Sequence, residues 1–232
     1  MKKNLVFIHG SAGSKRNFRT LIRNLPEYNC LAFDLIGFGA EKKPKIEYNL
    51  EVYLNFIQNK LDLQKKYVLI GHSMGGILSK EFALRHPRTA EKVLIINYPF
   101  NQEKIKHNWL NQMFIKETWT ARAMCNSKVL WKFLALPIGL IFFTKYLDSF
   151  WDYFKHSFHS ESGTLKSVIL KDDHNNLKKL KNKLILISGG RDPFLITDIC
   201  SKYKNYLIKD MGHLFFGFEE KIAKIIKREL GS

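Results

Sequence analysis

The sequence of 232 residues has little cysteine and no secretion signal. Its three cysteines, Cys30, Cys125 and Cys200, are widely spaced and odd in number, so they match neither a disulfide framework nor a zinc site. A small secreted protein held together by disulfides is therefore excluded, and a reducing cytoplasm is the simplest location. Lys2 and Lys3 precede only a short apolar run without a small-residue cleavage site. We therefore predict a cytoplasmic protein.

The sequence also lacks a hydrophobic run long enough to cross a membrane. The strongest candidate, residues 133–143, is too short for a span and is interrupted by Pro137 and Gly139. We predict no stable membrane insertion. Packing inside the protein, or in the wall of a pocket, is favoured for this stretch over a helix that lies on a lipid surface.

Acidic residues are few: 21 Asp and Glu stand against 38 Lys and Arg, which gives a net charge of +17. Such a balance suits nucleic acid, an anionic membrane or an acidic protein as partner. The excess charge is spread evenly along the sequence, which favours a general lysine bias over one basic binding face. We predict no nucleic-acid role. An acidic acyl carrier protein stays open as a partner, and the sequence does not define the oligomeric state.

Apolar segments that resemble strands alternate with segments that have helical periodicity. Hydrophobic residues make up 45% of the chain, which is typical of a globular protein with a sizeable core. Alternating strands and helices predict an α/β fold with a mostly parallel sheet covered by helices on both faces. About six strands are expected, at residues 4–8, 30–33, 67–70, 92–97, 183–188 and 206–208.

This alternation stops after the fourth strand. Residues 99–182 are rich in aromatic residues, helical in pattern, and too long and apolar for a loop. We predict that they form a helical cap inserted into a core made of residues 1–98 and 183–230. The aromatic residues of the cap suggest an apolar pocket beneath it.

Two groups of residues in this segment resemble parts of metal sites. They are the pair His156 and His159, and the run from Asp172 to His174. Neither group has further candidate ligands at a suitable spacing. We interpret both as surface turns or packing residues and predict no metal.

A candidate nucleophile lies between the third strand and the helix that follows it. The sequence there is Gly71-His72-Ser73-Met74-Gly75, and a strand that turns into a helix through G-x-S-x-G is a nucleophile elbow. Glycines are needed on either side because strand and helix pass close together at such a turn. The turn exposes the Ser73 hydroxyl above the sheet, where the start of the helix favours a developing negative charge.

Other polar residues also follow strands directly. Ser11 comes after the first strand, Asp192 after the fifth and His213 after the last. In a parallel sheet the carboxyl ends of the strands share one edge, where ligands bind. We therefore expect these residues to gather near Ser73.

The order Ser, Asp, His along the chain resembles the α/β-hydrolase fold superfamily, specifically its capped esterases and carbon–carbon bond hydrolases. The resemblance covers most of the chain outside the cap. It rests on five motifs, which are His9-Gly10 with its glycine loop, Asp34-x-x-Gly37-x-Gly39, the Gly71–Gly75 elbow, Gly190-x-Asp192 and Gly212-His213.

The resemblance implies a role for each site residue. Ser73 would be the nucleophile, His213 the general base and acid, and Asp192 the group that orients and stabilises the imidazole. The backbone N–H groups of Ser11 and Met74 would form the oxyanion hole. No cofactor or metal is then required.

The resemblance also separates structural residues from catalytic ones. His72 would pack at the elbow and Asp34 would shape a turn. Asp210 is a poorer candidate than Asp192 for the triad acid, because it shares a loop with His213. The hairpin that usually opens the fold is missing here, which is the reason for expecting about six strands.

The implied activity is hydrolysis of a small-molecule carboxylic ester with an apolar acyl or alcohol part, through an acyl-enzyme on Ser73. Cleavage of a carbon–carbon bond or a thioester is an alternative, as is an ester carried on an acyl carrier protein. A non-catalytic binding scaffold is the other class, and the intact triad argues against it. The natural substrate and its chain length stay undetermined.

Overall fold

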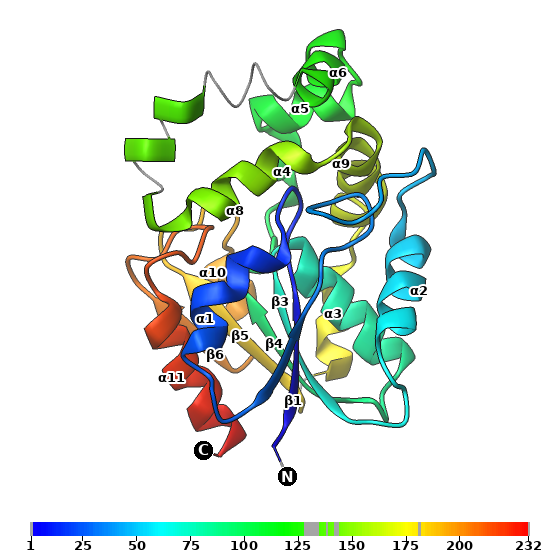
Figure 1. Cartoon of the computed structure of the whole chain (residues 1–232). Coiled ribbons are helices and arrows are strands. Elements are labelled where there is room, and N and C mark those ends of the chain that lie inside the picture. Colours follow the sequence, from blue (N-terminus) through cyan, green and yellow to red (C-terminus); the bar gives the residue numbers. More distant parts are fainter. Residues whose placement is uncertain (1, 128–134, 138, 142–143, 181, 232) are drawn as a thin grey trace.

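The computed structural model describes residues 2–127, 135–137, 139–141, 144–180 and 182–231. Its centre is one six-stranded sheet with strand order β2-β1-β3-β4-β5-β6. Every pair of neighbouring strands is parallel, so all six carboxyl ends meet at one edge (Figure 1). The predicted α/β fold, with a parallel sheet of about six strands, is confirmed.

The strands and main helices follow the predicted order. The strands are β1 (Asn4–Ile8), β2 (Asn29–Ala32), β3 (Tyr67–His72), β4 (Ala90–Ile96), β5 (Leu184–Gly189) and β6 (Asn205–Ile208). The helices of the first half are η1 (Lys15–Phe18), α1 (Arg19–Arg23), α2 (Leu50–Lys60) and α3 (Met74–Arg85). The last strands are accompanied by α10 (Thr197–Cys200) and α11 (Glu219–Leu230).

Alternating side chains of the strands build a separate core on each face of the sheet. Leu5 and Phe7 face a cluster that contains residues of α1 and α11. Val6 and Ile8 face the other cluster, which contains residues of α2 and α3. This period of two within buried strands explains why helices cover both faces, as Figure 1 shows.

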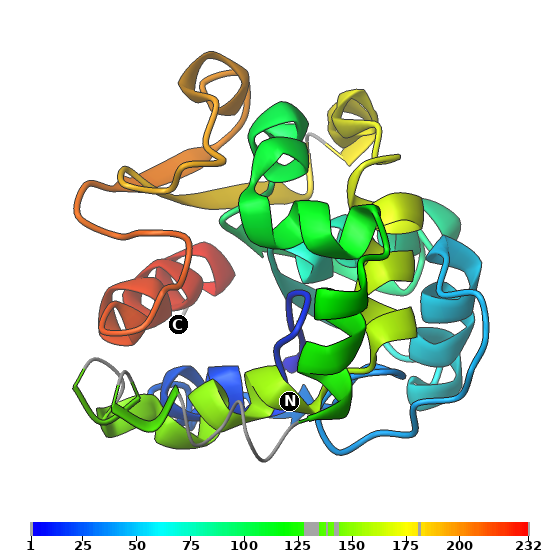
Figure 2. The same cartoon turned by 90° about the horizontal axis from the view of Figure 1, so that it is seen from above.

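The segment between β4 and β5 is helical where the structure describes it. It comprises α4 (Gln102–His107), α5 (Trp109–Ile115), α6 (Trp119–Asn126), η2 (Thr144–Tyr146), α8 (Leu147–Asp152), η3 (Tyr153–Lys155), α9 (Phe158–Thr164), η4 (Leu165–Ile169) and η5 (His174–Leu180). Figures 1 and 2 show α4, α5, α8 and α9 above the carboxyl ends of the strands, away from both termini. The division of the chain into a core and a cap stays a prediction.

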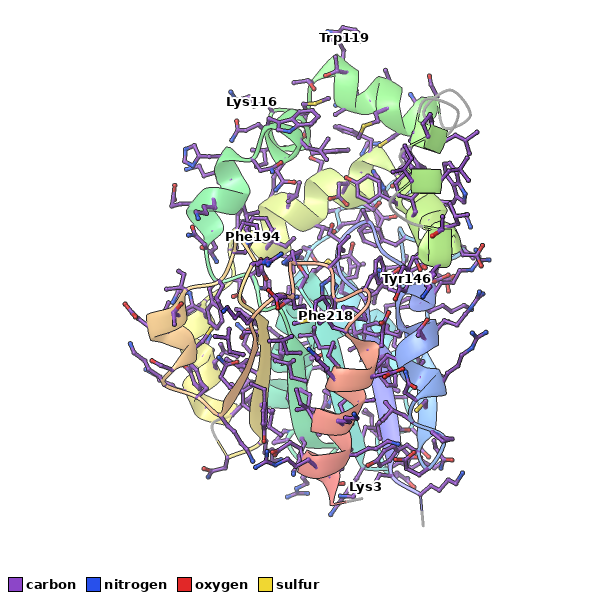
Figure 3. All side chains as sticks on the ribbon, turned by 90° about the vertical axis from the view of Figure 1, so that its left-hand side faces the viewer. Lys3, Lys116, Trp119, Tyr146, Phe194 and Phe218 are labelled. Atoms are coloured by element: carbon purple, nitrogen blue, oxygen red, sulfur yellow. The ribbon has the colours of Figure 1, made fainter. Side chains whose placement is uncertain are left out.

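The aromatic residues of this segment do not all face inward. Trp109 and Trp119 are 73% and 78% exposed, and Trp119 lies at the far end of the molecule from Lys3 (Figure 3). In the apolar run 133–143, Leu140 and Ile141 are also exposed, so packing does not account for them. Other members of the run, at 133, 134, 138, 142 and 143, lie outside the described residues. Among the described residues, no helix combines the length and apolarity needed to cross a bilayer.

Candidate active site

Ser73 lies at the junction of β3 and α3, in a backbone conformation that few residues adopt. Its φ is +53° and its ψ is −120°, which places it in the strained region found at sharp functional turns. A side chain at Gly75 would approach the Ile8 carbonyl oxygen to 1.9 Å, and one at Gly71 would approach the Gly75 carbonyl oxygen to 2.2 Å. The glycines therefore permit the close strand–helix contact that holds Ser73 in this conformation.

The structure brings Ser73, His213 and Asp192 together in one chain of hydrogen bonds. His213 Nε2 is 2.9 Å from Ser73 Oγ, and His213 Nδ1 is 2.9 Å from Asp192 Oδ2. The carboxylate of Asp192 is 1% exposed, and its other oxygen accepts a bond from the Phe194 backbone N–H at 2.9 Å. Asp210 instead pairs with exposed Arg191. This geometry allows the imidazole to take a proton from the serine hydroxyl.

The loop that carries His213 is held by two residues on neighbouring strands. Asn97, just after β4, donates through Nδ2 to the carbonyl oxygens of Gly212 and His213 and accepts from the Gly189 N–H. His72 Nε2 is 2.8 Å from the His213 carbonyl oxygen. Burial lowers the pKa of His72 to about 3, so its ring is neutral and donates to that carbonyl.

Asn97 was missed by the sequence analysis, although a signal was present. It is a polar residue at the carboxyl end of a buried strand, which is the criterion that selected Ser11, Asp192 and His213. Like Ser73, it adopts a φ of +53°. The prediction that His72 packs at the elbow agrees with its position against His213 and Phe215.

Ser11 and Met74, the predicted oxyanion donors, come from two different elements. Ser11 follows β1 and lines the same cavity as Ser73. Met74 is the first residue of α3, and N–H groups in a first helical turn have no acceptor within the helix. Their use as oxyanion donors stays a prediction.

Ser73 and His213 open into a cavity of about 650 Å³ between the strand ends and the helical segment. Its wall is mainly apolar. The apolar lining includes Ile105, Trp109, Leu110, Phe150, Phe154, Leu165, Ile169, Phe194, Leu214 and Phe216. The volume lies within the range of sites for small organic ligands.

One carboxyl group interrupts this apolar wall. Glu161, on α9, is 7% exposed, and its Oε2 accepts a bond from Ser11 Oγ at 2.8 Å. Burial is the main cause that raises its pKa to about 7, while bonds from Ser11 and the Ala12 backbone oppose the shift. No sequence pattern indicates Glu161, because it lies in the middle of a helix 150 residues from Ser11.

The two groups considered as metal ligands are His156 with His159 and the run from Asp172 to His174. His156 is buried and His159 is exposed. Of the two alternatives predicted for Asp172, a surface turn or a packing residue, the structure shows packing, because its carboxylate is 2% exposed and forms an ion pair with Lys80. Within the described ranges, no cluster of His, Cys, Asp and Glu has the form of a metal site.

Asp34 shapes a turn, as predicted, by accepting from the Lys15 and Ala40 N–H groups.

A family model described as the alpha/beta hydrolase fold matches residues 3–220. The chain belongs to this family. The match extends from the first strand into α11, so it includes all three residues of the hydrogen-bonded chain.

The chain is similar to curated proteins with different names. The chain is 28% identical to a probable lysophospholipase, BODYGUARD 4 of Arabidopsis thaliana, over 56% of its own length and 33% of that protein. It is 33% identical to a putative 2-succinyl-6-hydroxy-2,4-cyclohexadiene-1-carboxylate synthase of Haemophilus influenzae, over 35% of its length and 34% of the relative's. The chain thus spans about a third of the length of these relatives.

Among solved structures, a hydrolase from Pseudomonas aeruginosa superposes with a TM-score of 0.78. The superposition covers 100% of this chain and 91% of the other at 17% identity. At this identity the likeness shows the fold alone.

Proposed function

We propose that the protein is a serine hydrolase that cleaves a carboxylic ester through an acyl-enzyme on Ser73. The observation that carries the proposal is the continuous chain from Ser73 Oγ through His213 to the buried Asp192, with both bonds at 2.9 Å. A serine hydroxyl is a poor nucleophile at neutral pH and requires such a base. Membership of the hydrolase-fold family supports the same chemistry.

In the first half-reaction, Ser73 Oγ bonds to the ester carbonyl carbon while His213 Nε2 takes the hydroxyl proton. The carbonyl oxygen becomes an oxyanion that accepts from the N–H groups of Ser11 and Met74, and one such donor is worth about 10²–10³ in turnover. The ester C–O bond then breaks, and His213 returns the proton to the departing alcohol.

In the second half-reaction, water replaces the alcohol. His213 removes a proton from water as the water oxygen bonds to the acyl carbon. The bond from that carbon to Ser73 Oγ then breaks to release the acid, and His213 Nε2 returns the proton to Ser73 Oγ. Asp192 keeps Nδ1 protonated, so that Nε2 faces the serine, and stabilises the imidazolium. The bonds from Asn97 and His72 fix the His213 loop, which keeps the ring oriented through both halves.

The apolar wall of the cavity supports an ester with an apolar part. Burial of such a part is favourable at about 25 cal/mol per Å², and the cavity has room for a chain of several carbons. The likeness to a probable lysophospholipase also favours an ester substrate.

The test is hydrolysis of p-nitrophenyl esters of increasing acyl length by the parent, Ser73→Ala and Ser201→Ala proteins. We expect kcat/KM to fall by about 10³-fold or more in Ser73→Ala. Ser201→Ala removes an exposed serine at the end of α10 and is the matched control, with unchanged activity expected. A fluorophosphonate probe should label Ser73 alone.

Two results would contradict the proposal. Equal activity in the parent and Ser73→Ala would exclude Ser73 as nucleophile. Labelling of Ser73 without hydrolysis of any ester would keep the reactive serine but exclude simple esters, and would favour thioester or carbon–carbon substrates.

A further inference from the structure

Glu161 differs from the buried Asp192 and Asp152 because no basic side chain among the described residues is paired with it. Asp192 faces His213, and Asp152 is paired with Lys155 and Arg16. Within the described part of the chain, no Lys or Arg pairs with Glu161, and no Lys or Arg lines the cavity. A buried carboxylate without a counter-charge is costly, so the site has an unmet preference for positive charge.

A second polar group of the same wall also lacks a partner. Asn17, on η1, is 9% exposed and lines the cavity, and its Oδ1 is buried without a hydrogen-bond partner. Gly13, on the loop that carries Ser11, lies beside the Asn17 amide nitrogen. Asn17 and Glu161 therefore lie against the same loop, Gly10 to Gly13, and both line the cavity.

The chemistry of these two groups selects the kind of ligand. A carboxylate and an amide oxygen are both acceptors, so the bound group must be a donor. The aromatic rings of Tyr153 and Phe154 line the same cavity, and aromatic faces attract cations. A neutral hydroxyl would satisfy a hydrogen bond but would leave the buried charge uncompensated.

We propose that Glu161 and Asn17 form a subsite for an ammonium group on the acyl part of the substrate, close to the scissile carbonyl. The proposal deepens the proposed function and rests on it for the position of the ester. Ser11 sets the separation between the scissile carbonyl and the ammonium group. Its N–H would donate to the carbonyl oxygen, and its hydroxyl donates to Glu161 at 2.8 Å. Only a short spacer therefore fits between carbonyl and ammonium, as in a 3-aminopropanoyl ester.

The protonation state of Glu161 supplies an independent signature. Because burial raises its pKa to about 7, the empty site holds a proton on part of the molecules at neutral pH. An ammonium ion favours the charged carboxylate, so binding should release a proton. The titratable groups that feel the Glu161 charge are the phenols of Tyr53 and Tyr153, and burial raises the pKa of both. Neither phenol therefore titrates near neutrality.

The experiment measures binding to Ser73→Ala protein by calorimetry, so that ester cleavage is not required. The ligands are methyl 3-aminopropanoate, methyl butanoate, which replaces the ammonium by a methyl group, and methyl 3-hydroxypropanoate. We expect the amino ester to bind about 10–100-fold more tightly than methyl butanoate, as a charge-assisted bond provides. Adding Glu161→Gln should abolish the preference for the amino ester, and adding Asn17→Ala should reduce it.

Glu117→Gln is the matched control. It makes the same replacement on an exposed carboxylate of the same helical segment, paired with Lys166 and Arg122, and should leave the ratio unchanged. Near pH 7, the heat of binding to Ser73→Ala protein should also depend on the ionisation enthalpy of the buffer, because the buffer takes up the released proton. This readout detects proton release without a substitution of Glu161.

The outcomes separate this inference from the proposed function. Equal binding of amino, hydroxy and methyl compounds would overturn the subsite, even if p-nitrophenyl esters are hydrolysed. A preference shared by the amino and hydroxy esters would overturn the claim of charge. Selective, Glu161-dependent binding of the amino ester would support the subsite even if the parent cleaves no ester.

Discussion

Lys80 and Glu161 are both charged side chains withdrawn from water, but their surroundings differ. Lys80, on α3, is 0% exposed, and its Nζ lies 2.5 Å from Asp172 Oδ1 and 2.9 Å from both Glu81 Oε1 and the Asp173 carbonyl oxygen. Within the described residues, Glu161 accepts from the Ser11 hydroxyl and the Ala12 N–H and has no cation beside it. The first charge has a complete set of partners, whereas the second faces a cavity.

The difference distinguishes a structural charge from one available to a ligand. The Lys80 cluster joins the nucleophile helix to residues just before η5, and Tyr98 donates to the same Asp172 carboxylate. The Lys80 ammonium has three acceptors, one for each of its donors, so it positions elements and has no donor left for a ligand. Glu161, by contrast, has no cationic partner among the described residues, and it faces the cavity.

The largest expected effect comes from breaking the complete cluster. Lys80→Met should destabilise the protein by about 3–5 kcal/mol, because it leaves the Asp172 carboxylate buried without its cation. Unfolding in urea, followed by circular dichroism, measures the change. Adding Asp172→Asn should recover part of the loss, since the amide removes the unpaired charge. If Lys80→Met alone were as stable as the parent, water would have to reach the Asp172 carboxylate.

The contrast also shows which features can be predicted from sequence. The strands, the elbow and the residues after the strand ends could be predicted because each is a local pattern and because parallel strands align their carboxyl ends. Ser73, Asp192 and His213 come together for that reason, although they are up to 140 residues apart.

Neither buried charge could be predicted, because its partner comes from another element. Lys80 and Asp172 are 92 residues apart, and Glu161 and Ser11 are 150 apart. The sequence around Asp172 predicted no more than a surface turn or a packing residue. Only the packing of the helical segment against α3 and the Ser11 loop creates both environments, and no periodicity in the sequence encodes that packing.

An intermediate, pH-dependent effect is expected at Glu161. Its pKa is about 7 in the folded protein, against an ordinary value of 4.5, so the folded state binds more protons between these values. The stability that this group contributes is therefore present below pH 4.5 and is lost as the pH rises through 7. Glu161→Gln should match the parent near pH 5 and exceed its stability by about 1–3 kcal/mol at pH 8.

Thermal unfolding of both proteins across this pH range measures the difference. Glu117→Gln is a control of opposite sign, because Lys166 lowers the pKa of the Glu117 carboxyl. The stability that the ionised Glu117 carboxylate contributes is present at high pH and lost on acidification. Glu117→Gln should therefore be less stable than the parent at pH 8. A Glu161→Gln difference that does not change with pH would show that water or a counter-ion keeps this carboxyl ionised.

The smallest effect is expected for the ion pair between Arg85, on the same helix as Lys80, and Glu51 on α2. Arg85 forms two hydrogen bonds with Glu51, but the two side chains are 37% and 60% exposed. Arg85→Met makes the same replacement as Lys80→Met in a position where water solvates the remaining carboxylate, so the melting temperature should stay within about 2 °C of the parent. If Arg85→Met destabilised as much as Lys80→Met, burial would not be the cause of the difference, and the same reasoning applied to Glu161 would lose its basis.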